Sequence, residues 1–332
     1  MFGDGVLVCA SRRVITTIDE FVDPVASART TPMTLRPGAI RAEWVRAEFG
    51  KVLVEVGEYS FPIATRGETL ADRIVILAPL RRFASGHLNG EALAPGVLHS
   101  WGEQAEVAGA TAGPVQFGIM SFATQTLDRT AQVLGVELDL PGRGKFRTVG
   151  AVEWARLREV FDMVWQADCD VRRDASSESE AVAVGDLLVE LVVRSFAADD
   201  AFGAVVPQAR LNSVRIARAC EDHAARARYQ GVTLADLCIA AGASERRVRD
   251  AFYECYGMSP TAYLRVSALH EVRHELMEGP PVRDAVSRAA SDFGFWHLSR
   301  FAAQYRALFG ESPSTTLAQT SRVAPVLAES GA

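Results

Sequence analysis

The sequence predicts an α+β protein: an N-terminal antiparallel β barrel or sandwich with helices, then an all-α C-terminal domain. Three observations predict this class. Short β-branched runs lie between turn residues from Leu35 to Phe122, helical periodicity begins after Thr126, and one structural unit occurs twice near the C-terminus. The 332 residues exceed what one hydrophobic core usually organises, and an apolar content of 48% is enough to fill two.

The N-terminal part predicts an irregular lead-in over residues 1–34, followed by strands. Runs of β-formers at 51–56, 73–77 and 115–120 are typical of strands, and Gly50, Gly57, Gly67, Asn89-Gly90 and Pro95-Gly96 are typical of the turns between them. Short strands at intervals of about ten residues favour a small antiparallel barrel or sandwich.

Helical spacing replaces the strands after Thr126. Helices are predicted over 128–134, 149–167 and 181–196, the second with an apolar stripe formed by Val152, Leu157, Val160, Phe161 and Val164. The third helix carries the stripe Val184, Leu187, Leu188, Leu191 and Val192. That stripe has two interpretations, core packing or a dimerisation surface.

These patterns predict the domain organisation. Residues 35–197 form an effector-sensing or dimerisation domain, and 198–210 form a linker because Gly203 and Pro207 interrupt helical periodicity there. Residues 211–317 form the all-α domain, and the small, polar residues 318–332 are expected to be a disordered tail.

The all-α domain contains one unit twice. Val248, Phe252, Gly257 and Pro260 recur 53 residues later as Phe301, Tyr305, Gly310 and Pro313. The turn glycines Gly242 and Gly294 are 52 residues apart, so the second copy has one extra residue after its turn. Such self-similarity indicates a repeated structural unit.

Each unit predicts two helices joined by a tight turn. In the first, Thr233 caps a helix that reaches Ala240, residues 241–243 form the turn, and Ser244 caps a second helix that reaches about Tyr256. Gly242 suits the left-handed backbone of such a turn. The second helix buries Val248, Ala251, Phe252 and Cys255 at helical spacing, so Arg246, Arg247, Arg249 and Asp250 face outward.

The second unit predicts helices over 282–291 and 296–308, with a turn at 292–294 between them. Leu298, Phe301, Tyr305 and Leu308 are expected to be buried, and Trp296 is expected to pack beside Phe295. A helix over 261–277 connects the two units. Two helices held about 34 Å apart can enter successive major grooves of DNA, where arginine bonds to guanine.

The candidate DNA contacts are therefore the outward residues of the two second helices. They are Ser244, Arg246, Arg247, Arg249, Asp250, His297, Ser299, Arg300 and Arg306. The alternative interpretation of such a cluster is a solvated helix face. The repeated framework favours DNA contact for the three arginines of the first unit.

The residues also resemble a known family over about 105 residues, from Val214 to Leu317. The segments LADLCIAAGASERRVRDAFYECYGMSPTAYL and GFWHLSRFAAQYRALFGESPSTTL resemble the AraC/XylS transcription regulators, and among them the branch that includes regulators of ethanolamine utilisation. The resemblance implies an N-terminal domain similar to the cupin-like, arabinose-binding barrel. Three positions, Cys238, Asp250 and Ala268, depart from the family pattern, so the resemblance implies no particular target sequence.

Charge neither requires nor excludes a nucleic-acid partner. The formal charge of the chain is −6, whereas residues 211–332 hold 14 arginines against 13 acidic residues. This near balance gives the segment no large net positive charge, so the inference of DNA binding depends on where the arginines lie.

Two further function classes remain as alternatives. One is a DNA-binding regulator controlled only by a protein partner, and the weaker one is a cupin-type enzyme. A cupin metal site typically has a His-x-His pair, but the barrel segment has only His87 and His99, twelve residues apart. Cys9 and Cys169 have no histidine partner that the sequence can place. We therefore expect no enzyme activity, no metal and no cofactor.

The remaining expectations concern location and partners. The five cysteines form no C-x-x-C pair, which favours reduced thiols in the cytoplasm. No apolar run approaches the roughly 18 residues of a membrane helix, and the first residues do not resemble a signal peptide. The expected partners are double-stranded promoter DNA, a second copy of the chain, a small-molecule effector and, if the protein activates transcription, RNA polymerase.

Overall fold

The computed structural model describes residues 10–18, 20, 26–80, 86–89, 91–138, 145–148, 151–167, 175–197, 208–280 and 282–323. The chain divides into two compact units. One comprises Met1–Pro32 and Ile40–Gln208, and the other comprises Met33–Ala39 and Ala209–Ala332.

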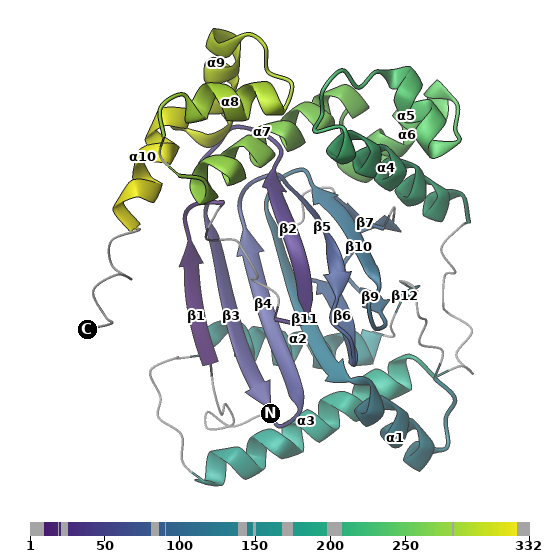
Figure 1. Ribbon diagram of the computed structural model, residues 1–332. Coiled ribbons are helices and arrows are strands. Elements are labelled where there is room, and N and C mark those ends of the chain that lie inside the picture. The colour runs from purple at the N-terminus through teal and green to yellow at the C-terminus, as the bar shows by residue number, and fades with distance from the viewer. Residues whose placement is uncertain are drawn as a thin grey trace. The chain divides into compact units, whose positions relative to one another are not determined.

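The described strands of the first unit form two sheets (Figure 1). A seven-stranded sheet has the order β1-β3-β4-β11-β6-β9-β12, and a five-stranded sheet has the order β2-β5-β10-β7-β8. The strands are β1 (Ala10–Ile15), β2 (Ala28–Thr34), β3 (Ala42–Phe49), β4 (Val52–Tyr59), β5 (Ile63–Thr69), β6 (Arg73–Pro79), β7 (Gly86–Leu88), β8 (Glu91–Ala92), β9 (Val97–Trp101), β10 (Glu106–Thr111), β11 (Val115–Ala123) and β12 (Lys145–Thr148). The order places strands distant in sequence side by side.

Alternation along each strand divides the side chains of the seven-stranded sheet between two faces. On β11, Met120 and Phe122 belong to the core shared with the helices, whereas Phe117 and Ile119 line a cavity. Residues of β6 alternate in the same way. One face of this sheet therefore holds the helices, and the other bounds the cavity.

Three helices complete the first unit: α1 (Thr124–Leu134), α2 (Ala151–Gln166) and α3 (Ala175–Ser195). Leu157, Val160, Phe161 and Val164 of α2 are buried, as their spacing predicts, but Val152 is exposed. Residues of α3 join the same core. The two antiparallel sheets and their helices confirm the predicted α+β class.

From Ala209 onward, the described residues of the second unit form helices and the turns between them (Figure 1). Its helices are α4 (Gln208–Arg226), α5 (Leu234–Ala241), α6 (Glu245–Tyr256), α7 (Pro260–Glu278), α8 (Ala285–Asp292), α9 (Leu298–Phe309) and α10 (Pro313–Val323). The pairs α5–α6 and α8–α9 are the two predicted helix-turn-helix units, and α7 connects them.

The repeat is structural as well as sequential. Phe252 and Tyr305, equivalent in the two copies, are both completely buried. Gly257 ends α6 and Gly310 ends α9, each in the left-handed conformation, with φ of 65° and 77°. The next helix begins at Pro260 in the first copy and at Pro313 in the second.

Three local predictions were wrong. The lead-in 1–34 is not irregular throughout, because β1 and β2 lie within it; β1 pairs with β3, a contact its own sequence SRRVI does not suggest. Gly57 lies within β4 rather than in a turn, opposite Trp44, whose ring would lie 2.5 Å from a Cβ at that position. Gly67 likewise lies within β5, against the backbone of Arg29. Both glycines allow close packing on the sheet.

The two predicted non-domain segments fall partly outside the described residues. Of the linker 198–210, only 208–210 are described, as the start of α4. Of the tail 318–332, residues up to Val323 continue α10, and 324–332 lie outside the described residues. Among the helices that are described, none has the length and apolar composition of a membrane span.

Candidate nucleic-acid interface and apolar cavity

The first helix-turn-helix is fixed by side-chain caps at both helix starts. Thr233 and Asp236 form a capping box at α5: the Thr233 backbone N–H donates to the Asp236 carboxylate over 2.8 Å, and the Asp236 N–H donates to the Thr233 hydroxyl over 3.3 Å. Hydrogen bonds from Thr233 lower the pKa of Asp236. Gly242 ends α5 with φ of 58°, and Ser244 accepts a hydrogen bond from the Arg247 N–H at the start of α6. These contacts confirm the predicted caps and turn.

The exposed face of α6 carries two ion pairs, each between residues one helical turn apart. Arg249 lies 2.6 Å from the Glu245 carboxylate, and Arg246 lies 3.8 Å from Asp250. The Arg246 side chain is 90% exposed, whereas Arg247 is half-buried. Glu245 was not among the predicted candidate residues, although its i,i+4 spacing to Arg249 is visible in the sequence.

Helix α9 presents a corresponding face. His297 is its N-cap residue but makes no side-chain capping bond. Ser299, Arg300 and Arg306 are exposed, as predicted. The core of this unit is made by Phe301, Tyr305 and Leu308 among others.

Two predictions about the start of α9 were wrong. Trp296 was expected to pack, yet it is 68% exposed, and Leu298 was expected in the buried stripe, yet it is 46% exposed. Phe295 takes the buried place instead, because its ring packs 5.0 Å from Phe301 and beneath the Arg265 guanidinium. Leu298 is the first residue of α9 and is equivalent to Glu245 of α6, which is also exposed.

Residues outside α6 and α9 hold the second helix-turn-helix, α8–α9, in place. Arg265 of α7 donates to the Gln304 amide oxygen of α9 over 2.9 and 3.0 Å, and its guanidinium lies 3.9 Å from the centre of the Phe295 ring. Arg273, also of α7, is buried and pairs with Glu311 at 2.7 Å. Neither arginine was anticipated, because their partners lie about 40 residues away in the sequence.

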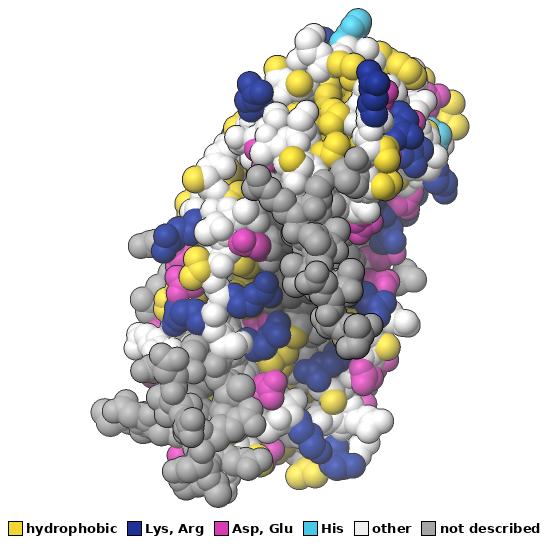
Figure 2. Space-filling model, turned by 60° about the vertical axis from the view of Figure 1, so that its left-hand side comes forward, with side chains coloured by type: hydrophobic (Ala, Val, Ile, Leu, Met, Phe, Trp, Pro, Cys, Tyr) yellow, Lys and Arg dark blue, Asp and Glu magenta, His cyan; other side chains and the backbone are white. Residues whose placement is uncertain are grey.

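The face seen in Figure 2 has no continuous basic patch over the described helices of the second unit. Dark-blue Lys and Arg side chains alternate there with acidic, apolar and polar ones. This agrees with the near balance of 14 arginines and 13 acidic residues over 211–332.

The predicted dimerisation stripe of α3 mostly belongs to the core of its own chain. Val184, Leu188 and Val192 are at most 5% exposed and pack with the sheet, which corrects their assignment to a partner surface. Leu191 is partly buried against the same core. Leu187 faces outward with 55% exposure.

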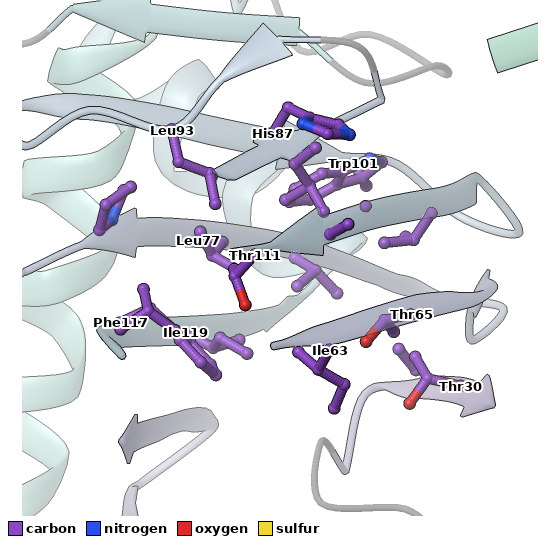
Figure 3. Close-up of a pocket in the computed structure, with 18 of the residues that line it drawn as sticks. Thr30, Ile63, Thr65, Leu77, His87, Leu93, Trp101, Thr111, Phe117 and Ile119 are labelled. Carbon is purple, nitrogen blue, oxygen red and sulfur yellow. The ribbon is translucent and has the colours of Figure 1, made fainter. Parts of the chain in front are cut away.

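A second candidate site is a cavity between the two sheets of the first unit, with a volume of about 110 Å³ (Figure 3). Its walls are largely apolar. They include Ile63, Leu77, Leu93, Phe117 and Ile119, together with Thr30, Thr65 and Thr111. His87 and Trp101 also line it, and Figure 3 draws both along one side.

The polar atoms of His87 and Trp101 are buried at this cavity. Counting only partners in the described part of the chain, neither His87 Nε2 nor Trp101 Nε1 has a hydrogen bond. Burial lowers the pKa of His87 to about 4, so its imidazole is neutral near pH 7. The described residues offer no group of three His, Cys, Asp or Glu side chains that could hold a metal ion.

The fold and the site together define a paired helix-turn-helix protein with an N-terminal β unit. Residues 237–319 match the family model described as a helix-turn-helix domain. A probable AraC family transcriptional regulator of Rhodopseudomonas palustris, whose structure is solved, is 32% identical, with 32% of this chain and 96% of that chain covered and a TM-score of 0.28.

Two curated relatives match the same region. A probable thc operon regulatory protein of Rhodococcus erythropolis is 30% identical over 102 residues, 31% of each chain. The XylDLEGF operon transcriptional activator of Pseudomonas putida is 36% identical over 90 residues, 27% of this chain and 28% of that protein. The matched part thus spans under a third of these curated relatives. The chain belongs to the AraC family, and the relatives named here are regulators of transcription.

Proposed function

We propose that this protein is a sequence-specific DNA-binding transcription regulator whose helices α6 and α9 enter successive major grooves of a promoter. The observation that carries the proposal is the repeated, capped helix-turn-helix with an exposed polar face on each second helix. On α6 this face includes Ser244, Arg246, Arg247, Arg249 and Asp250. On α9 it includes His297, Ser299, Arg300 and Arg306.

The ion pair between Arg249 and Glu245 supports a role in base readout. Exposed i,i+4 pairs contribute only about 0.3 to 0.5 kcal/mol to stability, so this pair does little for folding. A carboxylate bonded to both the Nε and a terminal nitrogen of Arg249 restricts the guanidinium before DNA arrives. A restricted guanidinium loses less side-chain entropy when it bonds a guanine.

We further propose that a small molecule binds in the N-terminal unit and controls DNA binding. A barrel filled by side chains would have favoured control by a protein partner alone. The cavity between the sheets, with its buried polar atoms at His87 and Trp101, favours a small-molecule effector instead.

The proposal extends to organisation and setting. The regulator acts in the cytoplasm as a homodimer, with residues 35–197 as the effector and dimerisation domain and 211–317 as the DNA-binding domain. Leu187 is the residue of the α3 stripe best exposed for contact with a second copy. By analogy with the named activator among its relatives, the protein activates transcription and RNA polymerase is its further partner.

Arg249→Ala tests the assignment of base readout. It should weaken binding to the preferred promoter fragment by about 1 to 3 kcal/mol while leaving binding to random duplexes of equal length nearly unchanged. Fluorescence anisotropy of the full chain, with fragments selected from its own genome at several salt concentrations, measures both affinities.

Arg158→Ala is the matched control, because Arg158 also pairs with an acidic residue one turn away but lies on α2. It should change neither affinity. An equal loss on specific and random DNA would reassign Arg249 to phosphate contact. Absence of any salt-sensitive binding by the wild type would refute the proposed function itself.

A further inference from the structure

The cavity of the first unit combines apolar walls with unmet hydrogen-bonding capacity. Trp101 is only 2% exposed, and its indole N–H can donate but never accept. No described residue accepts from it. A buried donor without an acceptor is unfavourable, so a molecule that brings an acceptor to this donor removes that penalty on binding.

His87 supplies a second polar atom from the opposite sheet. It lies on β7 of the five-stranded sheet, whereas Trp101 lies on β9 of the seven-stranded sheet. Both residues line the same cavity, and Figure 3 draws their side chains along one edge of it. The indole N–H can only donate, whereas the imidazole Nε2 donates or accepts according to its tautomer, so an oxygen of a bound molecule is a suitable partner for either group.

The charge of the lining determines which molecules fit. Among the described residues that line the cavity there is no Asp, Glu, Lys or Arg. His87 is itself neutral near pH 7, because burial lowers its pKa to about 4. An ionised ligand would lose its hydration here without gaining an opposite charge, which is strongly unfavourable.

The volume indicates the size of apolar body that fits between the walls. The cavity measures about 110 Å³, and an engineered apolar cavity of about 150 Å³ in another protein holds benzene. The space therefore suits a body of roughly one six-membered ring.

We propose that the effector is a compact, uncharged and largely apolar molecule, about the size of one six-membered ring. Its carbonyl or hydroxyl oxygen accepts a hydrogen bond from Trp101 Nε1, and His87 Nε2 is the second polar group of the same lining. This inference rests on the proposed control by a small molecule, and it names the chemical class and the two groups that orient it.

Three probes of similar shape test the class on the full chain. Cyclohexanone carries a carbonyl acceptor, methylenecyclohexane replaces that oxygen by CH₂, and cyclohexanecarboxylate is charged at pH 7. Titration calorimetry should show that the wild type binds cyclohexanone at least about tenfold more tightly than either of the others. Equal affinities for the ketone and the hydrocarbon, or tighter binding of the carboxylate, would overturn the proposal.

Trp101→Phe tests the group that donates. The variant should bind the ketone and the hydrocarbon with similar affinities, because the donor is gone and the apolar walls remain. Trp154→Phe is the control, since Trp154 packs against the helix-side core, away from the residues that line the cavity; it should keep the wild-type preference. A folded Trp101→Phe protein that still prefers the ketone would overturn the assignment.

A measurement on the wild type covers the case in which Trp101→Phe does not fold. The indole ¹⁵N–¹H resonance of Trp101 is assigned in the wild type by through-bond experiments. Its proton should move downfield when cyclohexanone is added and not when methylenecyclohexane is added. A resonance that does not respond would contradict the hydrogen bond. DNA binding is measured separately, so a failed ligand class leaves the proposed DNA-binding function standing, and a failed DNA assay leaves the ligand result interpretable.

Discussion

Buried histidines in the first unit couple its stability to pH. Burial lowers the pKa of His87 to about 4 and that of His99 to about 3, whereas an unfolded histidine has its ordinary value of 6.5. The unfolded chain therefore binds protons that the folded chain does not. Stability from these groups is fully present above about pH 6.5 and is lost as the pH falls toward 4 for His87 and toward 3 for His99.

We predict that His87→Gln makes the stability of the first unit less sensitive to acid. Between pH 7 and pH 5 the wild type should lose about 2 kcal/mol through His87 alone, and the variant should not show that part of the loss. Urea unfolding followed by tryptophan fluorescence at both pH values measures the difference. His274→Gln, at an exposed position on α7, should leave the wild-type dependence intact. An unchanged pH dependence in His87→Gln would show that His87 is hydrated when folded.

The segment between α4 and α5 holds the second helix-turn-helix at a fixed place within the helical unit. The Gln230 amide donates to the backbone oxygens of Ser291 and Asp292 over 3.3 and 2.9 Å, at the C-terminal end of α8. Arg228 reaches Glu275 of α7 at 2.8 Å and lies over the Phe293 ring. These contacts provide donors for carbonyl groups at a helix end. They also hold the second helix-turn-helix within the helical part of the chain independently of the connecting helix α7.

Gln230→Ala should therefore leave both helix-turn-helix repeats folded, but the position of α9 relative to α6 should no longer be fixed. We expect about a tenfold loss in affinity for a promoter that contains both half-sites, because the spacing of α6 and α9 is no longer fixed before binding. Affinity for a duplex with only one half-site should stay unchanged. Gln132→Ala on α1 serves as the control for the same chemical change in the first unit, and electrophoretic mobility shifts on the two duplexes measure the effect. Parallel losses on both duplexes would assign Gln230 to DNA contact or to general stability.

At the scale of the whole molecule, self-association is expected to depend on one exposed apolar side chain. Most of the α3 stripe is used inside the chain, which leaves Leu187 outward among the charged residues Asp186, Glu190 and Arg194. Leu187→Glu should give a folded monomer at micromolar concentration, because a charge buried in an apolar contact is costly. Analytical ultracentrifugation beside the wild type measures this.

Val152→Glu is the matched control, since Val152 is an equally exposed apolar residue on α2. It should leave the oligomeric state unchanged. A wild type that sediments as a monomer would exclude the dimer. A Leu187→Glu protein that stays dimeric would place the interface elsewhere.

Residue types and their spacing were enough to predict the features of this protein that depend on local interactions. The caps at Thr233 and Ser244 and the left-handed turn at Gly242 involve groups within a few residues of one another, so residue type and spacing were enough to predict them. Because the sequence repeats, the second helix-turn-helix could be predicted from the first. The buried stripe of α6 followed from helical periodicity, and so did the outward arginines.

Features that depend on contacts between distant segments could not be predicted in this way and became visible in the folded chain. Whether Phe295, Trp296 or Leu298 entered the core depended on Arg265 of another helix, and β1 became a strand by pairing with β3. The polar edge of the cavity required His87 and Trp101 to meet from two different sheets. Such contacts have no period in the sequence, because their geometry is set by the packing of whole sheets and helices rather than by neighbouring residues.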